Sequence, residues 1–211
     1  MAPKPRTSPR KPPQQARSKA TIDAILTATA RVLVKEGFDR ASTNRIAEAA
    51  GVSVGSLYQY FPSKEALVAA LVERHTDLMS AELSSAFERV AKLPLAAAAR
   101  ELVELLLRAH AIEPALHKVL IEQVPRVGRL GHVHDVEARS MRLQRAWMEM
   151  HTDELRPVDL DLAAFVVVTS VEALTHAATI YHPKKLTDGS LATEITALVV
   201  RYLGKPSARV A

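Results

Sequence analysis

The sequence has no cysteine, few glycines and no long apolar run, and each shortage excludes a class of protein or fold. Without cysteine, the chain can form no disulfide framework, no thiolate zinc site and no thiol nucleophile. The most apolar run, residues 162–171, is flanked by Asp161 and Glu172 and is far shorter than the roughly 18 apolar residues of a membrane-spanning helix. Seven glycines among 211 residues are about 3% of the chain, against roughly 7% on average. The composition therefore predicts a soluble, intracellular, helical protein.

Positive charge is concentrated at the N-terminus. The formal net charge of the whole chain is +5, whereas residues 1–19 hold six lysines and arginines and no acidic residue. The same segment holds five of the twelve prolines. This composition predicts a disordered basic arm over residues 1–15 rather than a secretory signal. Such an arm can bind DNA phosphates and release their counterions, although a solubilising tail is the alternative interpretation.

Proline positions and apolar periodicity divide the rest of the chain into helices. Apolar residues repeat at helical spacing between the prolines, and no stretch alternates convincingly with a period of two. We expect helices at residues 18–36, 43–50, 54–61, 64–91, 96–111, 114–124, 133–154, 159–181 and 190–203. Gly37 is expected to take the left-handed conformation that ends the first helix. The predicted fold class is therefore all-α, with about nine helices.

Residues 42–61 have the pattern of a helix-turn-helix, STNRIAEAAGVSVGSLYQYF. Ser42 or Thr43 can cap the first short helix. Gly51 can supply the positive φ of a tight turn, and Ser53 can cap the second helix. The small alanines of the first helix allow the two helices to cross closely.

The second of these helices has one apolar face and one uncharged polar face. Leu57 and Phe61 are predicted to be buried. The opposite face would carry Val54, Gly55, Ser56, Tyr58, Gln59 and Tyr60. Such a face can enter a major groove, where an amide reaches base edges and hydroxyl groups reach phosphates. The alternative is a pair of ordinary short helices in a bundle, with the tyrosines at the edge of its core.

Three strings carry a resemblance to a known family: residues 24–38, IAEAAGVS at 46–53, and GSLYQYFPSKEAL at 55–67. With them, residues 16–75 resemble the DNA-binding domain of the TetR family of bacterial transcriptional regulators. The resemblance covers somewhat under a third of the chain. Val54 stands where many relatives have lysine, which removes one phosphate contact. Beyond residue 75, only the order and lengths of the helices are similar.

The resemblance implies a domain plan and a set of DNA contacts. The plan is a three-helix DNA-binding domain at 16–63, with its recognition helix at about 53–61, then a larger effector-binding and dimerisation domain at 64–205 and a tail at 206–211. The implied contacts, mostly to the operator backbone, come from Thr43, Arg45, Ser53, Gly55, Ser56, Tyr58, Tyr60 and Lys64. Val54 and Gln59 would read bases.

The predicted helix at 159–181 is apolar on two sides. One stripe is Leu160, Ala164, Val167, Val171, Leu174, Ala178 and Tyr181, and the other is Leu162, Val166, Thr169, Ala173, Ala177 and Ile180. A helix that is apolar nearly all round must be covered on both sides. We expect a homodimer in which this helix and the one at 190–203 form a four-helix interface, as the resemblance also implies. A central core helix of a monomer is the alternative.

The middle helices mix aromatic, apolar and polar residues, which is typical of a pocket for a small, mainly apolar effector. The candidate ligand-binding residues are Phe87, Leu106, His110, Trp147, Phe165, Thr169, Glu172 and His176. For each of these residues alone, ordinary core packing is the alternative.

Histidine and carboxylate residues give no convincing metal or catalytic motif. His132 and His134 lie near Asp135 and Glu137, but the cluster lacks the partner spacing of a metal site. No nucleophile triad, phosphate loop or metalloprotease motif is present in the sequence. We therefore expect no metal, no cofactor and no enzymatic activity.

Together these patterns predict a cytoplasmic, dimeric, ligand-responsive DNA-binding regulator that binds no membrane. Repression through a pseudo-palindromic operator, relieved by the effector, is the expected action. A helical small-molecule carrier without DNA function and an enzyme with an unrecognised site are the rival interpretations. The sequence leaves open the effector, the operator, the regulated genes, activation in place of repression, and whether two or four subunits bind.

Overall fold

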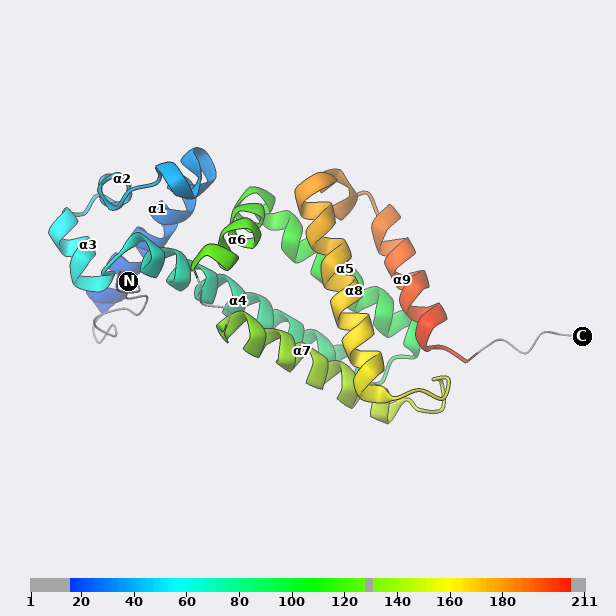
Figure 1. Cartoon of the computed structure of the whole chain (residues 1–211). Helices are drawn as coiled ribbons and strands as arrows, with labels where there is room; N and C mark the ends of the chain where they lie inside the picture. The colour runs from blue at the N-terminus through cyan, green and yellow to red at the C-terminus, as the bar shows by residue number, and fades with distance from the viewer. Residues whose placement is uncertain (1–15, 128–130, 206–211) are drawn as a thin grey trace, which may run out of the picture. The chain divides into compact units, whose positions relative to one another are not determined.

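The computed structural model describes residues 16–127 and 131–205, and the predicted arm (1–15) and tail (206–211) lie outside them (Figure 1). The described residues form nine α-helices and one short 3-10 helix, with no strand among them. The α-helices are α1 Ala16–Arg40, α2 Thr43–Ala50, α3 Val54–Tyr60, α4 Lys64–Val90, α5 Leu95–Ile112, α6 Pro114–Val127, α7 Gly131–Met150, α8 Leu160–Tyr181 and α9 Ser190–Leu203. The all-α prediction is confirmed.

Most helix ends agree with the sequence prediction within a few residues, and the exceptions have local causes. Gly37 has a positive φ of 75°, but its ψ of 169° is extended rather than left-handed helical. The chain therefore kinks at Gly37 and takes one more turn to Arg40. Helix α7 ends at Met150, and turns fill much of the segment to Leu155. A 3-10 helix at Pro183–Leu186 was not predicted.

The chain divides into two compact units, one of residues up to 76 with 115–133, the other of residues 77–114 with 134–211. The division falls inside α4, whereas the sequence placed the domain boundary at its start. The reason is that α4 residues such as Leu67 and Leu71 lie in the core of the first unit. Leu116 and Leu120 of α6 pack into the same core.

The core of the first unit fixes the positions of α2 and α3. Ile25 and Leu33 of α1, Ile46 of α2 and Leu57 of α3 are fully buried together. Each such side chain stabilises the fold by about 1.5–3 kcal/mol relative to exposure. Buried apolar side chains thus hold α2 and α3 against α1.

In the second unit, α8 and α9 pack on α5, and Trp147 of α7 donates a hydrogen bond from Nε1 to the carbonyl of Val90 at 3.1 Å. Among the described residues, α8 is the one helix long and apolar enough, by length and composition alone, to cross a membrane. The core helix of a soluble protein also meets that criterion. One side of α8, which includes Val167 and Val171, belongs to the core of this unit.

Candidate nucleic-acid interface and ligand cavity

The turn between α2 and α3 has the capping geometry of a helix-turn-helix. Ser42 Oγ accepts a hydrogen bond from the Arg45 amide at 3.3 Å, so Ser42 rather than Thr43 is the N-cap of α2. Gly51 takes the left-handed conformation, with φ 67° and ψ 29°, and ends α2. Ser53 Oγ then accepts from the Ser56 amide at 3.0 Å and caps α3. These caps and the turn agree with the sequence prediction.

Helix α3 has its apolar side in the core and its polar side at the surface. Leu57 and Phe61 are buried, whereas Val54, Gly55, Tyr58 and Gln59 are exposed. Ser53 is also exposed, and Ser56 and Tyr60 are half-buried. The first unit therefore presents an exposed, uncharged surface on α3 that a duplex groove can receive.

Two tyrosine hydroxyl groups are oriented by contacts that the sequence did not reveal. The Tyr58 hydroxyl lies 3.0 Å from Thr43 Oγ1, and either group can donate the hydrogen bond. Ser18 Oγ donates to the Tyr60 hydroxyl at 3.4 Å. Both contacts join α3 to residues far away in the sequence, so no local pattern could have predicted them. They fix the two phenol groups at the exposed edge of the unit.

Arg45 is engaged by acidic neighbours. Its guanidinium contacts Glu36 at 3.1 Å and Glu48 at 2.9 Å. These hydrogen bonds, that to Glu36 first, raise the pKa of Arg45 above its usual range. A DNA phosphate would have to compete with two carboxylates for this side chain.

Lys64, the first residue of α4, is held against α1. Its Nζ donates to the Phe38 carbonyl at 2.6 Å and lies 4.1 Å from the centre of the Phe38 ring. Ser63 Oγ accepts from the Ala66 amide at 3.2 Å and caps α4. Because an ammonium group has three donors, Lys64 can bond a phosphate while it keeps its carbonyl partner.

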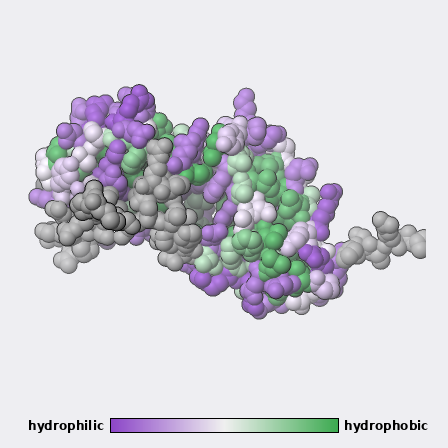
Figure 2. All heavy atoms as spheres, viewed as in Figure 1, coloured by the Kyte–Doolittle hydropathy of each residue, from purple (hydrophilic) through white to green (hydrophobic). Residues whose placement is uncertain are grey.

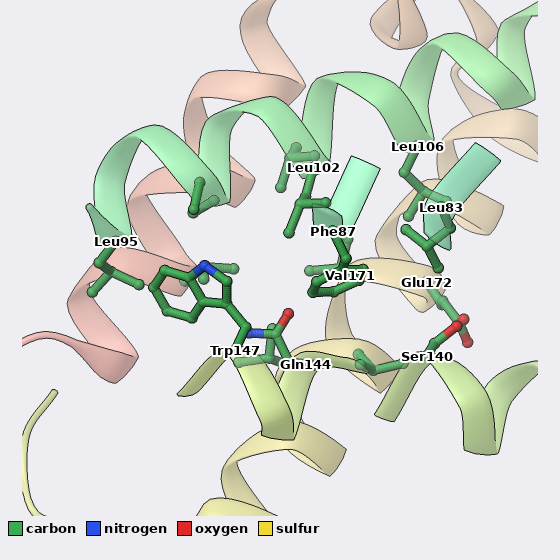
Figure 3. Close-up of a pocket in the computed structure, with 16 residues that line it drawn as sticks. Leu83, Phe87, Leu95, Leu102, Leu106, Ser140, Gln144, Trp147, Val171 and Glu172 are labelled. Atoms are coloured by element: carbon green, nitrogen blue, oxygen red, sulfur yellow. The ribbon is translucent and has the colours of Figure 1, made fainter. Parts of the chain in front are cut away.

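A cavity of about 80 Å³ lies in the second unit (Figure 3). It is lined by Leu83, Phe87, Leu95, Ala98, Ala99, Leu102, Val103, Leu106, Ser140, Gln144, Trp147, Val167, Val168, Val171, Glu172 and Val199. Only Ser140, Gln144 and Glu172 of this lining are polar apart from the indole nitrogen. Ligand pockets measure about 300–1,000 Å³. A ligand must therefore widen this cavity on entry.

The cavity brings together half of the residues that the sequence proposed for ligand binding. Phe87, Leu106, Trp147 and Glu172 line it, whereas His110, Phe165, Thr169 and His176 do not. The Leu106 carbonyl lies 2.8 Å from Nδ1 of the His110 ring. The His110 and His176 rings are tilted by 46° to each other, with ring centres 5.4 Å apart. The Phe165 side chain is 50% exposed.

Ser140 and Gln144, the other two polar residues of the lining, were not predicted from the sequence. They lie at positions i and i+4 before Trp147 at i+7, so they share its face of α7. That spacing was a usable signal. The lining residues of α5 carried no such signal, because their apolar pattern is that of an ordinary core-facing helix.

Within the part of the chain that the structure describes, Glu172 is the one ionisable residue in the lining of the cavity. Its burial raises its pKa to about 7, and the nearby Glu137 carboxylate contributes in the same direction. His176, one turn along α8, has a lowered pKa because burial disfavours its charged form. Of the predicted histidine cluster, the side chains of His132, His134 and Asp135 lie outside the described residues.

An exposed apolar face runs along α8 and α9 of the second unit, and we call it the outer face. Figure 2 shows hydrophobic side chains gathered where these helices lie. Its large exposed members are Leu162, Phe165, Leu174, Tyr181 and Leu198. The sequence assigned Leu174 and Tyr181 to the same stripe as Val167 and Val171, but Tyr181 is 72% exposed, whereas Val167 and Val171 are buried.

Comparison with known proteins gives two family matches. Residues 94–203 match the family described as "Tetracyclin repressor-like, C-terminal domain". Residues 25–71 match "Bacterial regulatory proteins, tetR family". The first match alone spans more than half of the chain.

Two curated relatives match parts of the sequence. The nucleoid occlusion factor SlmA of Haemophilus ducreyi is 52% identical over 40 residues, which are 19% of this chain and 20% of that protein. The uncharacterized HTH-type transcriptional regulator YuxN of Bacillus subtilis is 25% identical over 137 residues, 62% of this chain and 43% of that protein. The matches thus span about a fifth of the first relative and under half of the second.

A solved structure of a TetR family transcription regulator from Marinobacter aquaeolei has a TM-score of 0.67 to this chain at 21% identity. The superposition covers 90% of this chain and 98% of that chain. At this identity the likeness extends to the fold alone.

Proposed function

Since this chain belongs to the TetR family of bacterial regulatory proteins, we propose that it is a ligand-responsive transcriptional repressor that binds its operator as a homodimer. The family consists of DNA-binding regulators rather than enzymes. The observation that carries the proposal for this chain is the geometry of α3. Its capped start and its exposed, uncharged face follow directly from the left-handed turn at Gly51.

DNA is bound by α3 in the major groove. Gln59 and Val54 reach base edges, where an amide and a small apolar side chain can discriminate base pairs. Thr43, Ser53, Ser56 and the close-approach position Gly55 lie along the backbone. Tyr58, Tyr60 and Lys64 bond phosphates, and Arg45 joins them if a phosphate displaces its acidic partners.

Two copies pair through the outer face, built from α8 and α9. In the dimer the two α3 helices enter successive major grooves of a pseudo-palindromic site, roughly 34 Å apart. Phe165 belongs to this interface, which accounts for its exposure in the single chain. The protein acts in the cytoplasm, where the bacterial DNA lies.

The effector occupies the cavity of the second unit. To relieve repression, it must bind a conformation whose α3 helices no longer match the groove spacing, because equal affinity for both states shifts nothing. Helix α4 lies in both units, since it contributes Leu67 to one core and Phe87 to the other. It is therefore the element that transmits the change.

A gel-shift titration against the DNA beside the protein's own gene tests this function. We expect nanomolar binding that weakens steeply with salt, because phosphate contacts release counterions. Combined replacement Tyr58→Ala and Lys64→Ala should abolish the shift while circular dichroism keeps its helical signal.

The matched control is Lys184→Ala, which removes an exposed lysine from the second unit and should leave binding unchanged. Undiminished binding by the double variant would contradict the contact assignment. A wild-type protein that binds no such DNA, yet binds small apolar ligands, would favour a carrier without DNA function.

A further inference from the structure

The polar groups of the cavity come from two helices, and the rest of its lining is apolar. Ser140 and Gln144 come from α7, and Glu172 comes from α8. Figure 3 shows the Glu172 carboxylate at the opposite end of the cavity from Trp147. None of the described residues that line the cavity is a lysine, arginine or histidine. The cavity is thus an apolar space with one ionisable group at one end.

No described basic group balances Glu172. On α7, the charge that acts on the pKa of Glu172 is that of Glu137, which has the same sign. Arg145 of that helix is engaged with Glu149 at 2.6 Å and with Asp161 at 2.8 Å.

Charged groups on α5 and α8 do not change this conclusion. On α5, both Arg100 and Arg108 contact Glu104. On α8 itself, burial lowers the pKa of His176 and so disfavours its charged form. Among the described residues, the cavity therefore has a negative end without a counter-charge.

We infer that the effector is an organic cation with an apolar body, and that its positively charged head lies against Glu172. This inference rests on the proposed function, because it takes the cavity as the effector site. An ionised carboxylate in an apolar surrounding is costly unless it is paired. A cation supplies the missing pair, and it also offsets the repulsion between Glu172 and Glu137.

Other classes of ligand fit the cavity less well. An anionic ligand such as a fatty acid would meet two carboxyl groups and no basic side chain in the lining. A neutral ligand would leave Glu172 without a counter-charge. The size of the cavity also restricts how a ligand can enter. A cavity of about 150 Å³ holds a benzene molecule. The observed volume of about 80 Å³ is smaller, so a cation must displace the walls as it enters.

The cavity contains its own reporter. Trp147 is the single tryptophan of the chain and lines the cavity, so its fluorescence reports occupancy. Octyltrimethylammonium, octanol and octanoate share one alkyl tail and differ in the charge of the head. Each is titrated into the full-length dimer at about pH 8, above the pKa of about 7 of Glu172.

We expect octyltrimethylammonium to bind at least tenfold more tightly than octanol, and octanoate to bind most weakly. Glu172→Gln should remove the advantage of the cation while octanol affinity stays within about twofold. The control is Glu149→Gln, which removes an exposed acid from α7 outside the lining and should change nothing. The contrast between the two variants separates the charge of Glu172 from the net charge of the protein.

Equal affinities for cation and alcohol, tighter binding of octanoate, an unaffected Glu172→Gln variant, or no response to any probe would each overturn the inference. The proposed function is tested separately, by the gel shift without ligand. Operator binding combined with a preference for octanoate would reject the cation and retain the regulator. Absence of operator binding combined with a cation preference would reject the regulator and retain the cation.

Discussion

At the scale of single residues, Glu172 shows how burial and neighbouring charge act on one side chain. Burial raises its pKa from 4.5 to about 7, and the repulsion of Glu137 adds to the shift. A raised pKa means that the folded state favours the protonated acid more than the unfolded state does. Ionisation of Glu172 therefore opposes folding when no cation is bound.

This shift predicts a pH-dependent effect of Glu172→Gln on stability. Well below pH 4.5, Glu172 is protonated in both the folded and the unfolded state and costs little. As the pH rises toward about 7, the unfolded state ionises first and the wild type loses stability, up to about 3 kcal/mol above that pH. We expect the variant to gain no more than about 1 kcal/mol at pH 5 and up to about 3 kcal/mol at pH 8.

Urea denaturation of the two proteins at both pH values measures this difference. Glu149→Gln serves as the control, because the Glu149 side chain is 50% exposed and pairs with Arg145 at the surface. Its effect should be small at either pH. A Glu172→Gln variant that is equally stable relative to wild type at pH 5 and pH 8 would show that the carboxyl group is not desolvated.

Gly51 predicts a second residue-level effect. A side chain at position 51 would meet no atom within 4 Å, so Gly51→Ala creates no clash. It would instead force alanine into a φ of 67°, which costs about 1–2 kcal/mol. We expect urea denaturation to show this loss of folding stability. The m-value, which is the slope of the unfolding free energy against urea concentration, should change little. Gly55→Ala is the control, since position 55 has helical geometry and only one distant neighbour, and it should not reduce stability.

At the scale of helices, the sequence predicted most of the helix ends and turns that neighbouring residues determine. Capping serines and Gly51 gave the bounds of α2 and α3 because caps act through hydrogen bonds between neighbouring residues. Gly37 was a partial exception. Its positive φ was predictable, but the extended ψ depends on how Phe38 is held, including by Lys64 from α4.

Helix α8 shows where periodicity fails over a long element. The predicted stripe from Leu160 to Tyr181 repeats every seven residues, whereas an α-helix of 3.6 residues per turn drifts by about 20° per heptad. Over three heptads the drift moves Tyr181 away from the core, although Ala164, Val167 and Val171 near the start and middle are buried. In a helix of 22 residues, the period of the apolar pattern has to be measured rather than assumed.

The candidate sites differ in how far the sequence could predict them. The α3 surface is local, because one helix and one turn set which side chains face outward. The cavity needs five helices to meet, and only half of the residues proposed from the sequence line it. Position along a helix does not reveal which neighbouring helix covers it, so His110 and His176 could not be separated from Glu172 in advance.

At the scale of the whole molecule, the outer face is the surface through which we propose that two copies pair. Leu162, Phe165 and Leu198 expose large apolar side chains on neighbouring turns of α8 and α9. Contiguous exposed apolar patches of this kind mark contact surfaces in soluble proteins. In the proposed dimer, a second copy would cover the face with a self-complementary surface under two-fold symmetry, which would also pair the two α3 helices.

Phe165→Glu is expected to separate the dimer. It places a carboxylate from each subunit at the two-fold interface, where an unpaired buried charge costs about 3 kcal/mol or more. We expect analytical ultracentrifugation to give a dimer dissociation constant raised by at least a hundredfold, with unchanged helicity. Operator affinity should fall with it, because each half-site is then bound without the effective concentration that the dimer supplies.

Ile112→Glu is the matched control for this variant. Ile112 of α5 is 78% exposed and lies on a different helix from the outer face, so the same change of charge and size should leave the dimer intact. A Phe165→Glu protein that stays dimeric and keeps its operator affinity would contradict pairing through α8. Loss of the dimer in both variants would instead trace the effect to net charge, since both add one carboxylate to each subunit.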